Sequence, residues 1–149
     1  MNTEVMFSSR QQDWETPAAL FHQLQARYGF ALDAAATTGN AKCPRWFGPG
    51  GEAEDALTAR WPDDVAIWLN PPYREQRPFI EKVLDVIARR QLDGSRGQPI
   101  VCLLPARPDT ALFHDLIRPW GEVEFLRGRL RFVGAAASAP FPSMLVTFR

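Results

Sequence analysis

Runs of apolar residues alternate with amphipathic stretches along most of the chain. Residues 65–70 form a continuous apolar run of strand length, typical of a parallel strand that is covered on both faces. Residues 30–36 predict a short buried strand that runs into a turn, and residues 99–105 predict another buried strand. Residues 77–92 place their apolar side chains on one side of a helix, and residues 143–149 predict a last strand. We therefore expect an open α/β sheet that is mostly parallel, with an antiparallel C-terminal strand.

Local start and stop signals place the remaining elements. Thr16 can cap a helix whose first position is Pro17 and whose end is marked by Gly29. The four glycines and two prolines of residues 37–53 predict a long loop, and long ordered loops are often functional. The same reasoning predicts a short helix at 54–61, a helix at 109–120 capped by Asp109 or Thr110, and strands at 122–128 and 129–134.

Composition narrows the class of protein. The length of 149 residues favours one domain with one core, and the apolar fraction of 46% is that of a soluble globular protein. No apolar run approaches the roughly 20 residues of a membrane span, and residues 1–15 lack a secretory apolar core, so we expect a cytoplasmic protein. Cys43 and Cys102 form no CxxC pair, so we expect neither a metal site nor a disulfide.

The charge distribution favours an anionic partner, but weakly. Residues 1–70 carry 5 Lys/Arg and 9 Asp/Glu, whereas residues 71–149 carry 12 and 8. Of the 17 basic residues 15 are arginines, whose planar fork can donate two parallel hydrogen bonds to a phosphate. A solvated surface in a chain with an arginine-rich codon bias would give the same pattern.

The clearest chemistry follows the second apolar run, where Asn70, Pro71, Pro72 and Tyr73 stand in order. Residues at the carboxyl end of a strand lie where open α/β sheets bind ligands. The Asn70 side chain offers an acceptor oxygen, and proline holds nearby carbonyls without a competing N–H group. The lone pair of an exocyclic amine is delocalised into the ring, and two hydrogen-bond acceptors on its N–H groups would make the nitrogen more reactive. A tyrosine ring can stack on a base. A simple turn is the alternative, because asparagine and proline also favour turns.

This segment resembles motif IV of the amino-methyltransferases, which transfer a methyl group from S-adenosylmethionine to an exocyclic or amide nitrogen. The resemblance implies that Asn70 and the Pro71 carbonyl accept hydrogen bonds from the target amine. It also implies that Pro72 stiffens the turn, that Tyr73 holds the base and that Asn70 lies next to the cofactor. Catalysis would then consist mostly of positioning, with the released proton passing to solvent.

Two further segments resemble parts of this group that contact the cofactor. In DWETP, the residues Trp14, Thr16 and Pro17 match the segment at the methionine end of S-adenosylmethionine. In EDAL, Asp55 matches the segment that contacts the adenine or ribose of the cofactor. Thr16 and Pro17 also satisfy the start of a helix, a role compatible with cofactor binding, and Asp55 could equally be a helix cap.

The segment LDAAA takes the place of motif I of the same group. The resemblance implies that Asp33 accepts from the cofactor's ammonium group and that Ala34 lies against the cofactor. A turn-capping role for Asp33 is the alternative. Alanines stand where the group has glycines, and alanine permits close approach but not a positive φ.

The order of the segments DWETP, LDAAA, NAKCPRWF, NPPY, LLPAR, GRLRF and APFPS is similar to that of the small, phage-type, Dam-like DNA N6-adenine methyltransferases. The match covers nearly the whole chain. It implies a Rossmann-like fold that depends on S-adenosylmethionine and acts on a flipped adenine of double-stranded DNA. We expect residues 1–149 to form a single methyltransferase domain with no separate large target-recognition domain.

Five arginines are candidates for DNA binding. Arg74 follows the NPPY segment, and Arg107 lies just beyond a strand end, where it could bind a phosphate or pair with Asp109. Arg127, Arg129 and Arg131 stand at alternate positions, so on a strand they would share one face as a phosphate track. A charged strand edge that prevents aggregation would look the same.

Three functions therefore compete. The first is a DNA adenine-N6 methyltransferase in which loops 37–53, 74–77 and 134–142 recognise the target, and a homodimer is one arrangement in which they would do so. The second keeps S-adenosylmethionine but methylates RNA adenine or a protein glutamine. The third is an inactive binding relic, because a fold alone does not establish activity.

Overall fold

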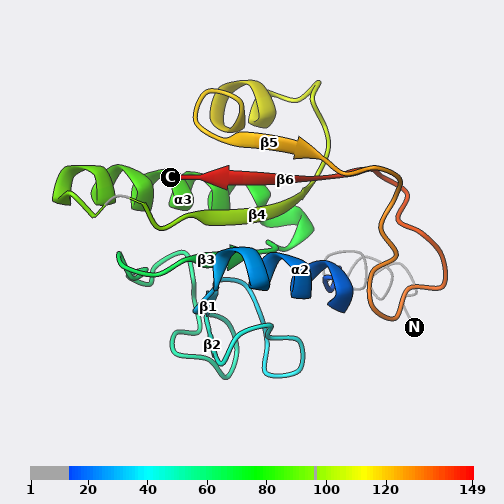
Figure 1. Cartoon of the computed structure of the whole chain (residues 1–149), viewed down its shortest axis with the longest axis horizontal. Helices are drawn as coiled ribbons and strands as arrows, with labels where there is room; N and C mark the ends of the chain where they lie inside the picture. The colour runs from blue at the N-terminus through cyan, green and yellow to red at the C-terminus, as the bar shows by residue number, and fades with distance from the viewer. Residues whose placement is uncertain (1–13, 96) are drawn as a thin grey trace.

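The computed structural model describes residues 14–95 and 97–149. Within these ranges one six-stranded sheet runs through the molecule in the order β2-β1-β3-β4-β6-β5 (Figure 1). The strands are β1 (Leu32–Asp33), β2 (Arg45–Trp46), β3 (Ile67–Leu69), β4 (Ile100–Pro105), β5 (Glu122–Phe125) and β6 (Ser143–Phe148). The helices are α2 (Ala18–Tyr28) and α3 (Gln76–Asp93), with a 3-10 turn at Tyr73–Glu75 and a π-helical turn at Phe113–Ile117.

The sheet is mixed in the way that the apolar pattern predicts. β2, β1, β3 and β4 form three consecutive parallel pairs, whereas β6 is antiparallel to both β4 and β5. All three residues of β3 are buried, as expected for a central parallel strand covered on both faces. The predicted α/β class, with a mostly parallel sheet and an antiparallel C-terminal strand, is confirmed.

Helices cover the sheet on opposite sides (Figure 1). Along β4, Ile100, Cys102 and Leu104 belong to the core on the α3 side, and Val101 and Leu103 belong to the core on the α2 side. This alternation follows from the period of two along a strand. The α2-side core also contains Phe132 and Phe141 from the long segment between β5 and β6. This segment therefore acts as a second cover beside α2.

Sequence signals for the two long helices are confirmed. α3 spans the predicted amphipathic stretch and ends at Gly94, whose φ of 76° is left-handed. α2 ends at Gly29 in the same conformation, with a φ of 65°. No helix in the described part of the chain combines the length and apolarity needed to cross a lipid bilayer. Cys43 and Cys102 are both buried and free.

Three expected elements are wrong. Residues 54–61 form turns rather than a helix, because a single backbone bond from Ala59 N to Asp55 O is not continued. The loop at 37–53 contains the edge strand β2, whose two residues pair with β1. Residues 129–134 form no strand, because Gly128, with a φ of 71°, turns the chain away from the sheet.

Two helix starts also need correction. Pro17 precedes α2 rather than lying inside it, and Thr16 makes no cap bond, since its hydroxyl is used by another segment. The helical region predicted at 109–120 covers only residues 111–117. Its predicted cap is confirmed at Thr110, whose Oγ1 accepts from Phe113 N at 3.2 Å.

Candidate active site

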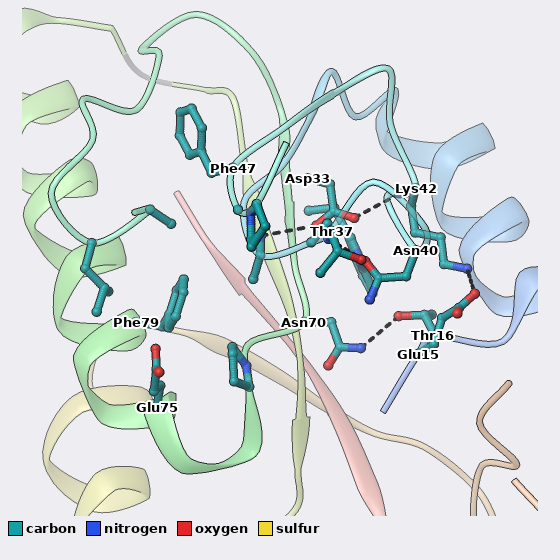
Figure 2. A pocket seen from close by; sticks show the side chains of 18 of the residues that line it. Glu15, Thr16, Asp33, Thr37, Asn40, Lys42, Phe47, Asn70, Glu75 and Phe79 are labelled. Atoms are coloured by element: carbon teal, nitrogen blue, oxygen red, sulfur yellow. Dashed lines mark hydrogen bonds and ion pairs between the residues drawn. The ribbon is translucent and has the colours of Figure 1, made fainter. Parts of the chain in front are cut away.

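A cavity of about 360 Å³ lies at the carboxyl ends of β1 and β3, and we call it the large cavity. Asp33 ends β1, Phe47 follows β2 and Asn70 follows β3, so parallel strands deliver all three to one edge of the sheet. Figure 2 shows these side chains around the opening, with Glu15 and Thr16 entering from the segment before α2. The predicted location of the site, beyond the carboxyl ends of the strands, therefore coincides with this cavity.

Asn70 is held in one orientation by residues more than fifty positions away. Its Nδ2 donates to Trp14 O at 2.5 Å and to Thr16 Oγ1 at 3.1 Å. Both N–H groups of the amide are therefore used, and Oδ1 is the group left to accept a bond from a ligand. In Figure 2 this oxygen points away from Thr16. The DWETP segment thus orients the NPPY asparagine.

The residues after Asn70 divide between two cavities. Pro72 lines the large cavity, and its carbonyl accepts from Glu75 N at 2.9 Å to start the 3-10 turn. Pro71 is buried and lines a second, narrow cavity together with Tyr73. Asn70 lines both, so the motif forms the wall between them.

The narrow cavity has only about 10 Å³ of free volume because aromatic rings fill it. The Tyr73 and Phe141 ring centroids are 5.9 Å apart, and the Trp14 ring contacts Phe141 edge-on at 5.5 Å. Trp14 lines the large cavity as well. A planar molecule could enter only if Tyr73 and Phe141 move apart. Phe141, in the APFPS segment, belongs to the α2-side core and also lines the narrow cavity.

Asp33 is an ionisable side chain that is almost fully buried. It is 2% exposed, and its carboxylate accepts from Lys42 N at 3.0 Å and from Ala35 N at 3.3 Å. Burial raises the pKa of Asp33 to about 6 from its ordinary value of 3.8, against the lowering effect of these N–H groups and of the Lys42 charge. The turn-capping role and a place in the cavity wall therefore coexist.

The large cavity is strongly acidic. Its described lining residues include five carboxylates and one cation, Lys42, whose Nζ pairs with Glu15 Oε2 at 2.9 Å (Figure 2). The sequence alone indicates no role for Lys42 or Glu15, although Lys42 lies within the NAKCPRWF segment. The carboxylates are Glu15, Asp33, Glu54, Asp55 and Glu75.

The three alanines after Asp33 need no positive φ. Ala34 is fully buried and donates its N–H to Trp68 O, while Ala35 and Ala36 line the large cavity. The glycine that this turn requires is Gly48, whose φ is 137°. A Cβ atom there would lie 1.7 Å from Ala36 O, so only glycine lets the two loops pack this closely.

Asp55 and Pro17 occupy peripheral positions. Asp55 lines the large cavity, but it is exposed and its Oδ1 accepts from Leu57 N at 2.9 Å within a turn. Pro17 is half-buried at the start of α2 and is not among the residues that line the cavity. The two residues thus differ in how directly they could touch a ligand.

An open groove of about 240 Å³ lies beside the narrow cavity, and we call it the arginine groove because Arg74, Arg77 and Arg107 line it. Arg107 donates to the Tyr73 hydroxyl, and its guanidinium carbon lies 5.3 Å from the Tyr73 ring centre. Among the described contacts Arg107 therefore pairs with Tyr73 rather than with Asp109. Arg77 had no role in the sequence interpretation.

The proposed strand-face track of Arg127, Arg129 and Arg131 is wrong in its geometry, because these residues lie in the segment between β5 and β6 and in neither strand. Leu130 and Phe132 pack inward against the α2-side core, which leaves the intervening arginines exposed. Arg131 donates to Ala135 O at 3.1 Å and to Ala136 O at 3.3 Å, which closes its own loop.

Comparison with known proteins shows similarity to a protein family and to a phage protein. A family model described as "DNA N-6-adenine-methyltransferase (Dam)" matches residues 3–146. The chain is also 29% identical over 118 residues to a protein of Escherichia phage T1 named "DNA N-6-adenine-methyltransferase". That alignment covers 78% of this chain but 45% of the phage protein, so the chain spans less than half of that relative's length.

Proposed function

Because the chain belongs to the DNA N-6-adenine-methyltransferase (Dam) family, we propose that it transfers a methyl group from S-adenosylmethionine to the N6 amine of adenine in DNA. The mixed α/β sheet would then be a compact Rossmann-like methyltransferase fold. A site at its carboxyl edge is where such sheets bind their ligands.

One observation carries the proposal: the large and narrow cavities share Asn70 and Trp14. A methyl transfer needs a donor and an acceptor on either side of one contact point. The large cavity is spacious enough for a cofactor of this size, and the narrow one is lined by aromatic rings, as suits a base. Asn70 lies where the two would meet.

The lining of the large cavity fits S-adenosylmethionine chemically. Five carboxylates against one lysine suit a ligand with a sulfonium and an ammonium group. We assign Asp33 to the ammonium group and Asp55 to the adenine or ribose of the cofactor. Trp14, Thr16, Pro17 and Ala34 contribute to the cavity wall or hold it in place. When bound, S-adenosylmethionine supplies an electrophilic methyl group on sulfur.

The chain's own residues prepare the acceptor. Asn70 Oδ1 accepts from one N–H of the adenine amine, and the Pro71 carbonyl accepts from the other, which favours a pyramidal nitrogen. Pro72 fixes the turn, and Tyr73 stacks on the base, a contact that contributes roughly 1–3 kcal/mol in other systems. The adenine must leave the duplex to reach this position.

Arginines near the narrow cavity would bind the DNA strand that carries the target base. Arg74 and Arg107 line the arginine groove, whose wall includes Tyr73, so a phosphate there would lie close to the extruded nucleotide. Arg127, Arg129 and Arg131 are exposed on the loop that covers the narrow cavity and would add weaker phosphate contacts. This placement puts positive charge on the acceptor side and negative charge on the cofactor side.

The test is methyl transfer from radiolabelled S-adenosylmethionine to unmethylated plasmid DNA, followed by digestion to nucleosides. We expect the label in N6-methyldeoxyadenosine, with single-molecule sequencing to locate the modified adenines. Label in RNA or protein offered in parallel reactions, with none in DNA, would identify another acceptor. No transfer together with no cofactor binding would identify an inactive relic. Asn70→Ala provides the negative control.

A further inference from the structure

Two buried polar atoms at the narrow cavity lack a hydrogen-bond partner among the described residues. They are Ser143 Oγ and Trp14 Nε1, and both residues line this cavity. Ser143 is 1% exposed. Buried polar groups are nearly always paired, so an unpaired one at a cavity wall indicates the place where a ligand bonds.

The position of Ser143 is fixed by the sheet. Ser143 begins β6, pairs with Pro105 at the end of β4, and accepts from Leu126 N at 3.0 Å through its carbonyl. Asn70 follows β3, two strands away in the sheet order. Asn70 stands level with Leu103 of β4, and Ser143 pairs with Pro105, two residues further along. With strands about 4.8 Å apart and a rise of about 3.3 Å per residue, the two backbones are separated by roughly 12 Å. Their side chains therefore stand on opposite sides of a space that one base and its hydrogen bonds would fill.

The hydrogen-bonding pattern of the cavity matches the Watson–Crick edge of adenine. Asn70 Oδ1 is an acceptor, as the N6 amine of adenine requires, and a serine hydroxyl can donate to the adjacent N1. Guanine presents the opposite pattern, with an acceptor at O6 and a hydrogen on N1. A flipped base is commonly recognised on this edge.

We propose that Ser143 Oγ donates a hydrogen bond to N1 of the target adenine and is a specificity-determining residue of the narrow cavity. The proposal rests on the proposed function. Trp14 Nε1 is a second donor at the same wall and would face another ring acceptor. Tyr73 and Phe141 must separate to admit the base, whereas Ser143 stays in place because it belongs to the sheet.

The test compares Ser143→Ala with wild type on two duplexes that contain the mapped target sequence, one with adenine and one with 1-deazaadenine at the target. On adenine we expect kcat/KM of the variant to fall about 10- to 100-fold, the range for a lost hydrogen bond in a site built to make it. On 1-deazaadenine, which has no N1 acceptor, the ratio of wild type to variant should fall to about 1. Because wild type and variant are compared on the same duplex, any difference in amine reactivity between adenine and 1-deazaadenine cancels from each ratio.

Thr147→Val is the matched control, because it removes another buried hydroxyl of β6 outside the cavity. We expect it to have the wild-type ratio between the two duplexes. Ser143→Ala should unfold at no lower temperature than wild type, since the lost hydroxyl has no partner in the fold.

Equal losses on both duplexes, or full activity of Ser143→Ala on adenine, would overturn the assignment while leaving the proposed function intact. A wild-type protein that methylates neither the adenine duplex nor any other DNA would overturn the proposed function, and this inference with it. Failure of the Ser143 assignment would thus be seen in the variant, and failure of the proposed function in the wild-type protein.

Discussion

The large and narrow cavities meet at Asn70 and differ in nearly every physical property. The large cavity is open, acidic and built mostly by loops that follow β1, β2 and β3. The narrow cavity is closed by the Tyr73 and Phe141 rings and has arginines beside it. A soluble cation could enter the first without any rearrangement, whereas a base could enter the second only when rings move.

This difference implies that the two halves of the site can be damaged separately. Substitutions of the carboxylates that line the large cavity should weaken cofactor binding and leave the acceptor side intact. Substitutions at the narrow cavity should slow transfer and leave cofactor affinity unchanged. The wall between them, at Asn70, should show the largest effect on transfer.

Asn70→Ala should reduce the rate of methyl transfer about 10³-fold, the upper range for removing one preorganised group that acts on developing charge. The loss follows from the missing Oδ1 acceptor and not from unfolding, because the side chain is only half-buried. Single-turnover assays with labelled cofactor would measure it. A variant with wild-type rates would remove Asn70 from the mechanism.

Asp33→Asn should weaken S-adenosylmethionine binding about 10- to 100-fold at pH 8, since hydrogen bonds to charged groups contribute roughly 1.5–3 kcal/mol. Wild-type affinity should fall as the pH drops through about 6, because the Asp33 carboxylate, whose pKa burial raises to that value, becomes neutral. Calorimetry across pH 5–8 measures both effects. Equal pH dependence in wild type and Asp33→Asn would contradict the assignment.

Asp33 has the opposite effect on the stability of the free protein. Its pKa in the fold, about 6, is above its ordinary value of 3.8, so the folded state binds the proton more tightly than the unfolded state does. Its contribution to the free energy of unfolding is therefore fully present below pH 3.8 and is lost as the pH rises through 6. Asp33→Asn should lack this pH dependence in urea titrations of the free protein.

Thr16→Val should reduce kcat about fivefold, because a neutral hydrogen bond contributes roughly 1 kcal/mol and its loss lets the Asn70 amide rotate. Thr16→Ser keeps the hydroxyl that accepts from Asn70 Nδ2, and it should restore the rate. Cofactor affinity should change little in either variant. If Thr16→Ser is as slow as Thr16→Val, the hydroxyl does not position Asn70.

Arg107→Gln should have the smallest effect, a few-fold loss of DNA affinity with the salt dependence of binding reduced by about one charge. Arg60→Gln is the matched control, since Arg60 is exposed and pairs with Asp63 before β3 begins. Filter-binding measurements of DNA affinity from 50 to 200 mM salt would distinguish the two variants. Identical salt slopes for the two variants would remove Arg107 from the DNA interface.

The acceptor half of the site could be predicted from the sequence because its residues are contiguous. Asn70, Pro71, Pro72 and Tyr73 follow one buried strand, so a local pattern locates them at the edge of the sheet. α3 and the long strands were also predictable, since their apolar periods are strong. The fold class and the residues proposed to bind the target base could thus be predicted from local sequence patterns.

The cofactor half depends on contacts between distant segments, which a single sequence does not reveal. Thr16 resembles a helix cap, yet its hydroxyl accepts from Asn70, 54 positions later. The LDAAA turn needs no glycine of its own, because Gly48, on another loop, allows the two loops to pack closely at Ala36. Residues 129–134 alternate like a strand because Leu130 and Phe132 pack inward from a loop. In each case tertiary packing outweighs the local pattern.

We propose that a cofactor site in the large cavity and an acceptor site in the narrow cavity meet at Asn70. The most direct test is a crystal structure with S-adenosylhomocysteine bound. We predict that the ligand lies in the large cavity, with its amine on Asp33, its purine toward Asp55 and its sulfur facing Asn70. A ligand bound outside this cavity would contradict the account. So would the reverse orientation, with the purine against Asn70 and the sulfur turned away.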